Sequence, residues 1–413
     1  MYFYQWYFSG LYGILKEKPK REYLLILGSV GLVLTHSVIA LYTAILCFIY
    51  LIVQCKTLKK KQVRKKIFIS IFFILVLSSF FWAPLLEHKL ATKYEVFKSG
   101  RMERTEVLVA LKLDFFELFF TPKENIRIYE IGLLSTILLI MTPVALKKLK
   151  EKWKNTDFYR FYIFSLIVGI VSCIMTLKIF PFELLPSILK MLQFSFRMLE
   201  FSSFFLAFVV AVNIAMLVKK MKYRDIIVFL IILMLLSTIL IPHLQYTNNL
   251  DEERLWPAVP VTENTGRVHA GCASFEYLPS KAFENRSYIE TRKDEIIIIE
   301  GNVEISEYKK ENTNLYCVLK NGEEQTKLEL PYIYYLGYEV TIEQSGNIEK
   351  LETYETENGF IGVSIPSLEE GSLKVHYEGT VLMKISSIIS VLGVIGLFIS
   401  FKNLKETKKQ RKN

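Results

Sequence analysis

Six apolar runs alternate with short polar and basic segments along the chain. The runs cover residues 67–86, 131–146, 158–177, 198–218, 226–244 and 385–401. Each approaches the roughly 20 apolar residues that an α-helix needs to cross the hydrocarbon core of a bilayer. The pattern therefore predicts an α-helical polytopic membrane protein, and a composition of 52% hydrophobic residues agrees with it.

The basic residues predict how these helices are oriented. Lys and Arg, which give the 413-residue chain a net charge of +10, crowd into segments 56–66, 147–154, 219–224 and 402–412. Basic loops remain on the cytoplasmic side, and two apolar runs separate each consecutive pair of these segments. The segments 87–130, 178–196 and 245–384 are then expected outside a bacterial plasma membrane, with the C-terminal tail in the cytoplasm.

A further apolar stretch, 22–54, has basic residues at both ends, so both ends are expected on the cytoplasmic side. It is shorter than the roughly 40 residues that two full spans need. A short pair, 22–34 and 38–54, satisfies both constraints, with Thr35, His36 and Ser37 at its apex. About eight spans result, two of them short. One tilted helix is the alternative, and it would break the charge rule.

Two other segments have a different character. Residues 1–21 carry no signal-peptide pattern and are expected to form an aromatic and basic segment at the cytoplasmic face. In 245–384 the periodicity falls to two, and Asn-Gly or Glu-Gly turn signals recur at 321–322, 358–359 and 370–371. This pattern predicts an all-β, sandwich-like extracytoplasmic domain before the last span. The strands are expected at 295–299, 315–319, 327–330, 338–342, 360–365 and 373–377.

Ionisable residues at the outer ends of the predicted spans are candidate site residues, because a charge buried near a membrane costs free energy unless it is paired. His36 is either a catalytic base or phosphate ligand, or a residue that hydrogen-bonds carbonyls freed at the helix break. Glu87 and His88 follow an aromatic helix end. They are either catalytic residues or ordinary solvated residues just beyond a span.

Arg197 and Glu200 lie where the fourth apolar run begins. They are three residues apart and can simply pair, but the planar guanidinium also fits two phosphate oxygens. Arg197, Gln193 and Glu200 are therefore a candidate lipid-phosphate site, with a snorkelling Arg as the alternative. Asp114 and Glu117 are expected on an amphipathic segment that lies flat on the membrane.

Several classes of site are not indicated by any motif. The sequence contains no phosphate-binding loop, nucleophile elbow, HExxH or Cys/His metal spacing. No cofactor is predicted, although a divalent metal would be compatible with the chemistry. The basic clusters are short juxtamembrane runs that contact anionic lipid and require no nucleic-acid partner. Of the five cysteines, Cys272 and Cys317 could pair outside the membrane.

Three features together resemble a known group of membrane proteins. They are "LTHS" at the apex of the short pair, "LQFSFRMLEF" at 192–201 leading into a span, and the "YYLGYEV" and "NGFIGVSIP" stretches of the β-domain. This order resembles the GT-C glycosyltransferase superfamily, namely the YfhO-like and the 6-pyruvoyl-tetrahydropterin-synthase-related membrane families. The "QFPWR"-like pattern of these families falls on residues 193–197, with Ser195 and Phe196 in place of its Pro-Trp.

The resemblance implies transfer of a sugar from a polyprenyl-phosphate carrier to a cell-envelope glycan or lipid acceptor at the outer face. GT-C enzymes carry an acidic catalytic residue in an early external loop, and no such loop precedes the first apolar stretch here. The sequence is therefore expected to be a C-terminal portion that is inactive alone and works with a missing N-terminal half or other envelope proteins. The alternatives are a non-catalytic scaffold that displays the β-domain and a transporter of lipid-linked sugars.

Overall fold

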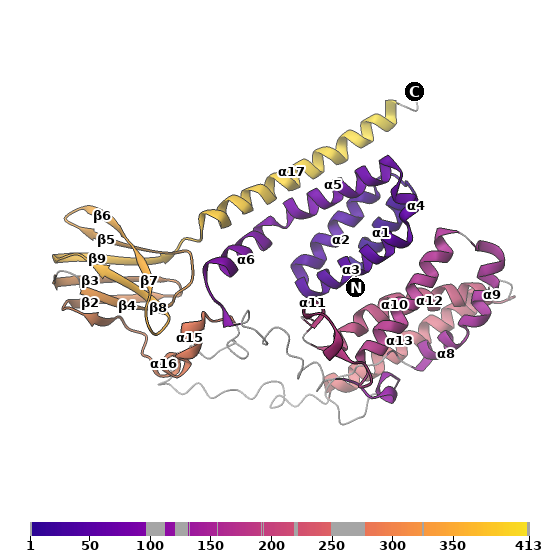
Figure 1. Cartoon of the computed structure of the whole chain (residues 1–413), viewed down its shortest axis with the longest axis horizontal. Helices are drawn as coiled ribbons and strands as arrows, with labels where there is room; N and C mark the ends of the chain where they lie inside the picture. Colours follow the sequence, from indigo (N-terminus) through magenta and orange to yellow (C-terminus); the bar gives the residue numbers. More distant parts are fainter. Residues whose placement is uncertain are drawn as a thin grey trace. The chain divides into compact units, whose positions relative to one another are not determined.

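The computed structural model of the chain separates into two compact units (Figure 1). The first unit contains Met1–Ile71 and Met102–Pro257, and the second contains Phe72–Arg101 and Ala258–Asn413. The structure describes residues 2–95, 112–119, 131, 133–154, 156–190, 192, 194–218, 222–248, 277–323 and 326–410.

The first unit is helical. Its helices and 3₁₀ turns are α1 (Tyr2–Leu15), α2 (Arg21–Thr35), α3 (Ser37–Val53), α4 (Cys55–Leu58), the first part of α5 (Lys61–Leu77), η2 (Phe115–Leu118), α8 (Leu133–Ile140), α9 (Thr142–Trp153), α10 (Asp157–Thr176), η3 (Phe182–Leu184), α11 (Ser187–Lys190), η4 (Ser195–Arg197), α12 (Met198–Val218) and α13 (Arg224–Asn248).

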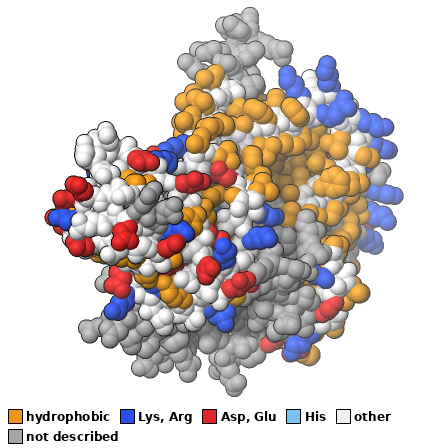
Figure 2. Space-filling view, turned by 60° about the vertical axis from the view of Figure 1, so that its left-hand side comes forward, with side chains coloured by type: hydrophobic (Ala, Val, Ile, Leu, Met, Phe, Trp, Pro, Cys, Tyr) orange, Lys and Arg blue, Asp and Glu red, His pale blue; other side chains and the backbone are white. Residues whose placement is uncertain are grey.

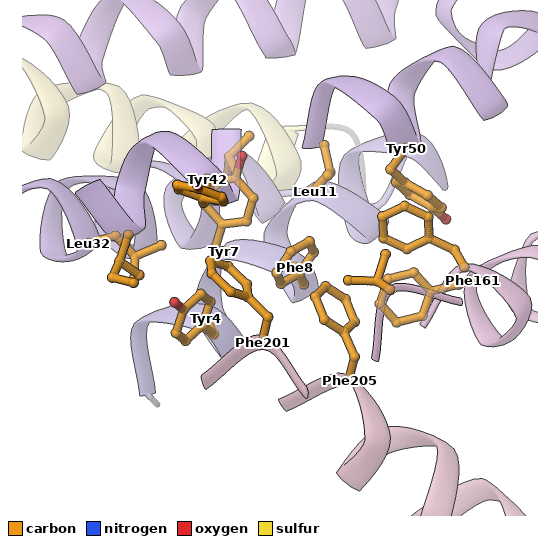
Figure 3. Close-up of a cluster of buried hydrophobic side chains, with 14 of the residues drawn as sticks. Tyr4, Tyr7, Phe8, Leu11, Leu32, Tyr42, Tyr50, Phe161, Phe201 and Phe205 are labelled. Carbon is orange, nitrogen blue, oxygen red and sulfur yellow. The ribbon is translucent and has the colours of Figure 1, made fainter. Parts of the chain in front are cut away.

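Helices α1 and α2 form a closely packed hairpin. Gly28 lets the backbones approach, because a Cβ there would lie 2.5 Å from the Tyr7 nitrogen and 2.9 Å from the Phe3 carbonyl oxygen. Tyr4, Tyr7 and Phe8 of α1 are buried in the core of the unit, against α10 and α12 (Figure 3), whereas Trp6 is exposed. The sequence predicted an aromatic and basic segment at the cytoplasmic face for 1–21, and the structure forms α1 there with one side in the core of the unit. The reason is its helical spacing of Tyr4, Phe8 and Leu11, which places all three on one face.

Three helices in the described residues are long and apolar enough to cross a membrane: Asp157–Thr176, Ser195–Val218 and Val381–Ser400. A membrane location is therefore possible, although the finding is weaker than the expected eight spans. Helix α13 covers the predicted run 226–244. The predicted run 131–146 is instead divided at Met141 between α8 and α9, where Pro143 enters the first turn of α9.

The predicted run 67–86 is also broken. Helices α5 and α6 (Ser79–Ala91) meet at a 65° bend at Ser78. The Ser78 hydroxyl donates to the Ile74 carbonyl at 2.6 Å, and Pro84 lies inside α6. Paired serines and a proline are common causes of sharp kinks.

Helix α17 (Val381–Gln410) satisfies the backbone groups released by this bend. The Ser390 hydroxyl lies 3.1 Å from the Val76 carbonyl and 3.1 Å from the Phe80 nitrogen. Ser79 donates to the Ser386 carbonyl at 2.9 Å, and its hydroxyl lies 2.9 Å from that of Ser390. Since apolar surroundings offer no other partner, these serines hold α6 against α17 within the second unit.

Ion pairs bring three basic segments to one end of the first unit. Lys16 lies 2.7 Å from Asp157, and Lys60 pairs with Glu17. Lys66 lies 3.4 Å from Glu22. The α1–α2 turn, the segment around α4 and the start of α10 thus share this end, as the charge rule requires of loops on one side of a membrane.

The β-domain of the second unit consists of antiparallel strands in two sheets. The strands are β1 (Ile297–Glu300), β2 (Glu304–Glu311), β3 (Asn314–Gly322), β4 (Thr326–Ile333), β5 (Tyr338–Gln344), β6 (Asn347–Leu351), β7 (Thr353–Glu355), β8 (Phe360–Ile365) and β9 (Leu368–Tyr377). The sheet orders are β1-β4-β8-β7 and β2-β3-β9-β5-β6, and alternate residues of both sheets enclose one core. The prediction of a C-terminal antiparallel β-domain is confirmed.

The prediction from the sequence was wrong about some details of this domain. Strands β2 and β6 were missed because they expose most of their residues and lack an apolar alternation. Strand β7 was missed because its three residues, all partly buried, are too few to show a period. Glu370 and Gly371 do not form a turn but pair with Lys320 and Leu319 inside β9. Figure 2 shows that apolar side chains are spread over the visible surface of the helices, whereas charged side chains lie on the visible surface of the β-domain.

A buried ion pair fastens the helices α15 (Ser280–Glu284) and α16 (Arg286–Thr291) to this domain. Arg292 lies 3.2 Å from Glu329, with both side chains at most 3% exposed. Glu329 also accepts hydrogen bonds from Tyr288, Thr356 and Asn358. The carboxylate is therefore fully partnered, and its role is structural.

We expect Gly28→Ala to lower the free energy of unfolding of the first unit by about 1–3 kcal/mol, because the added methyl group overlaps the α1 backbone. Thermal unfolding of the detergent-solubilised chain measures it. Gly396→Ala is the matched control, since its Cβ would lie 3.8 Å from the nearest atom, on Phe73. Equal melting temperatures for the two variants would contradict the close-packing argument.

We expect Arg292→Ala to destabilise the β-domain by about 3–5 kcal/mol, because Glu329 would remain as an uncompensated buried charge. Hydrogen exchange of the β4 and β8 amides in the full chain reports the change. Lys327→Ala removes the exposed pair between Lys327 and Glu300 and should cost no more than about 1 kcal/mol.

Candidate functional site

A group of polar side chains lies in the first unit where α2 ends, α3 begins and α12 begins. It consists of Tyr4, His36, Arg197 and Glu200, and we call it the polar cluster. The ion-paired basic segments described above adjoin the start of α2 and the start of α10. The start of α2 is the end of that helix opposite to His36. The polar cluster therefore occupies the end of the helical unit away from the ion pairs.

His36 is held by the helix break itself. Its backbone nitrogen donates to the Leu32 carbonyl at 3.0 Å, which closes α2. Its Nδ1 accepts from the Ile39 nitrogen at 3.5 Å, which caps α3. Burial, and then the positive charge of Arg197, lower the pKa of His36 below its ordinary value. The imidazole is therefore neutral near neutral pH, and Nδ1 is its accepting nitrogen.

Arg197 lies at the end of η4, immediately before α12. Its guanidinium donates to the Leu192 carbonyl at 2.9 Å and lies 4.8 Å from the centre of the Phe194 ring. These contacts fix the guanidinium, and its positive charge acts on His36, which comes from a distant part of the sequence. The structure thus brings together two residues that the sequence identified separately.

Glu200 and Tyr4 complete the cluster. The Glu200 carboxylate interacts electrostatically with Arg197 and with Tyr4. Tyr4 is only 3% exposed. Its hydroxyl has no hydrogen-bond partner of normal geometry among the described residues. Thr43 and Glu200 lie close enough to act on the Tyr4 hydroxyl, but neither forms a hydrogen bond of normal geometry with it. A buried unsatisfied hydroxyl is costly, and a polar ligand would relieve that cost.

Tyr4 was missed by the sequence analysis, which treated segment 1–21 as one surface stretch. The helical spacing of its aromatic residues could have revealed a buried face. A second missed residue is Tyr42, whose hydroxyl donates to the Leu189 carbonyl and so ties α3 to the segment that leads to Arg197. Gln193, the third predicted phosphate ligand, lies outside the described residues.

Glu87 and His88 belong to the second unit. Glu87 accepts a hydrogen bond from the Thr380 hydroxyl at 2.5 Å. His88 Nδ1 lies 2.9 Å from the Tyr94 hydroxyl, and Tyr94 stacks on Tyr335 with ring centres 6.2 Å apart. Both residues are thus engaged within their own unit, and the structure does not bring them together with the polar cluster.

The other candidates have local roles. Asp114 and Glu117 form a capping box around η2, and Lys178 donates to Asp114 at 2.6 Å. That their segment lies flat on the membrane stays a prediction. Cys317 is a free, fully buried thiol in the sandwich core, so it is not in a disulfide with Cys272. Within the described part of the chain, His, Cys, Asp and Glu form no group of three that could hold a metal ion.

Comparisons with known proteins do not add to this geometry. No family model matches the chain, and no match is found among curated proteins or solved structures. The resemblance to GT-C enzymes therefore stays an expectation from short motifs, and the case for a site rests on the polar cluster itself.

The contact between His36 and Arg197 predicts a coupled titration. Removing the guanidinium with Arg197→Gln should raise the pKa of His36 toward 6.5, although burial will keep it lower. Imidazole NMR shifts measured against pH in the detergent-solubilised chain follow this change. Lys178→Gln, which neutralises an exposed lysine paired with Asp114, should leave the titration unchanged. An identical His36 titration in Arg197→Gln would mean that the two residues do not interact.

Proposed function

We propose that this chain is a multi-pass membrane protein that binds the phosphate of a lipid-linked sugar carrier at the polar cluster. The observation that carries the proposal is the convergence of Arg197, neutral His36 and the unpartnered buried hydroxyl of Tyr4. A guanidinium and a hydroxyl are the donors that a phosphate oxygen needs. A charged headgroup would reach them from the interface while its chain remained in the bilayer.

Glu200 has a different role from the one that the sequence suggested. A carboxylate repels phosphate and cannot donate to it when ionised. We infer that Glu200 orients Arg197 and, in the absence of ligand, balances its charge. When phosphate binds, the guanidinium is shared between the two anions. His36 would remain neutral and act as a hydrogen-bonding partner or proton acceptor.

The proposed orientation places the polar cluster at the outer face. The three ion-paired basic segments would lie at the cytoplasmic face, and the β-domain would lie outside, tethered by α17. Three apolar helices and the bent α5–α6 pair support a membrane location, and the finer count of about eight spans is part of the proposal.

The reaction that fits this site is glycosyl transfer of the GT-C kind. An acceptor hydroxyl would attack the anomeric carbon, the bond from that carbon to the phosphate oxygen would break, and the carrier phosphate would leave with its electron pair. Arg197 would stabilise that departing charge, and a base would take the hydroxyl proton. His36 is the base available within the cluster, since His88 and Glu87 belong to the other unit.

A second candidate function is display of the β-domain as a non-catalytic scaffold. It is favoured by the self-contained core of the two sheets and by the Arg292–Glu329 network, which make a rigid module attached to α17. A scaffold has no requirement for Arg197 to bind carrier phosphate, so carrier binding separates the two functions.

We expect Arg197→Ala to weaken binding of a polyprenyl phosphate about ten- to a hundredfold, because one or more charge-assisted hydrogen bonds are lost. Titration of the purified full chain in nanodiscs measures it, with the uncharged polyprenol as the reference ligand. Lys178→Ala is the matched control, since it removes an exposed cation that lies two residues beyond the last residue of α10, Thr176. Undiminished phosphate binding by Arg197→Ala would rule out the carrier site.

Tyr4→Phe provides a variant that folds. Since its hydroxyl has no hydrogen bond of normal geometry among the described residues, removing it should leave the melting temperature equal or higher while weakening phosphate binding about tenfold. A purely structural role for Tyr4 would give the opposite pattern, with lower stability and unchanged binding.

A further inference from the structure

A shallow groove of about 520 Å³ runs along one face of α6 in the second unit. Six residues of α6 line it in two rows, and within each row the residues are four positions apart. One row is Trp82, Leu86 and Leu90, and the other is Ala83, Glu87 and Ala91. Leu382, in the first turn of α17, provides the remaining wall. The groove therefore lies within one unit, separate from the polar cluster.

The lining favours a hydrocarbon chain as the occupant. Helix α17 is apolar enough to cross a membrane, and only 17% of its apolar window is buried by the chain. Its exposed surface is then at hydrocarbon depth, where a groove between two helices is filled by an acyl chain. The volume is that of a small-ligand site, and one face of a 13-residue helix is too short for a stable protein interface, which buries more than about 1,000 Å².

One carboxylate interrupts this apolar surface. Glu87 is the single charged residue among those that line the groove. It accepts from Thr380, the residue immediately before α17, so it lies where the helix begins and the β-domain ends. Burial, and then the Glu87 charge, raise the pKa of the nearby Tyr377. An anionic acceptor on the wall of an apolar groove matches a headgroup that donates hydrogen bonds and carries no negative charge.

We propose that this groove binds one hydrocarbon chain of a membrane amphiphile whose head donates a hydroxyl hydrogen bond to Glu87. A sugar or glycerol head supplies such hydroxyls. This site goes beyond the phosphate site, because its carboxylate repels the phosphate that Arg197 would attract. The chemistry of the two sites is complementary, since one takes an anionic head and the other takes a neutral hydroxylated head.

Fluorescence of Trp82 tests occupancy of the groove. The chain has four tryptophans, so replacing Trp6, Trp153 and Trp256 with Phe leaves Trp82 as the single reporter. An alkyl glucoside brominated on its chain is titrated into the full-length protein in nanodiscs. We expect saturable quenching. Linear quenching without saturation, as from bulk lipid partitioning, would overturn the proposal.

Two alanines provide a matched pair for the same titration. Ala91 lines the groove, whereas Ala44 is exposed on α3 in the other unit. Ala91→Phe fills the groove and should weaken the saturable quenching at least about tenfold. Ala44→Phe should leave it unchanged. Equal effects of the two substitutions would show that the quencher does not occupy the groove.

The headgroup part of the proposal has its own comparison. The brominated glucoside is compared with a brominated alkyl phosphate of the same chain length. Glu87→Ala should weaken glucoside binding about tenfold and remove the preference over the phosphate, because a charged acceptor is lost. Thr380→Val removes the hydroxyl donor to Glu87 but keeps the carboxylate, so the preference should persist. If the Glu87→Ala variant still bound the glucoside more tightly than the phosphate, Glu87 would not be the residue that recognises the headgroup.

Discussion

Each break in an apolar helix releases backbone N–H and C=O groups that apolar surroundings cannot satisfy. Two such breaks in the described residues have clear solutions. At the first break, His36 supplies partners for both α2 and α3. Its backbone nitrogen closes α2, and its imidazole caps α3. At Ser78 the partners come from far along the chain, since Ser390 of α17 bonds to groups on both sides of the bend. The remaining architecture of each unit is compatible with these local solutions.

The candidate sites lie at the same places. His36 is in one break, Arg197 is on the 3₁₀ turn before α12, and Glu87 is on the helix that follows the bend. A broken helix offers polar groups at a depth where a continuous helix would offer none. Chemistry at a membrane interface therefore depends on the residues that satisfy the breaks, and a substitution that straightens a helix would remove the site.

The sequence predicted those features that depend on local pattern. The apex at His36 and the alternation of the longer strands follow from charge, hydropathy and period two, which neighbouring residues determine. The bend at Ser78 could not be found in this way, because the serines that stabilise it are about three hundred residues away. Likewise the sequence identified His36 and Arg197 only separately, because it is the packing of the helices that brings them into interaction. Tyr4 was overlooked because its burial depends on that tertiary packing and not on the composition of its segment.

The unpartnered hydroxyl of Tyr4 is the strongest reason to regard the polar cluster as a binding site and not as a helix-end ion pair. Arg197 and Glu200 alone would be explained by mutual neutralisation, and His36 alone by capping. Neither explanation accounts for a buried donor left without an acceptor, which costs about 1–3 kcal/mol. A phenylalanine would fill the same space among Phe201 and Phe204 without that cost. An acceptor that arrives with the ligand would repay the cost at the moment of binding, and a phosphate oxygen held by Arg197 is an acceptor of this kind.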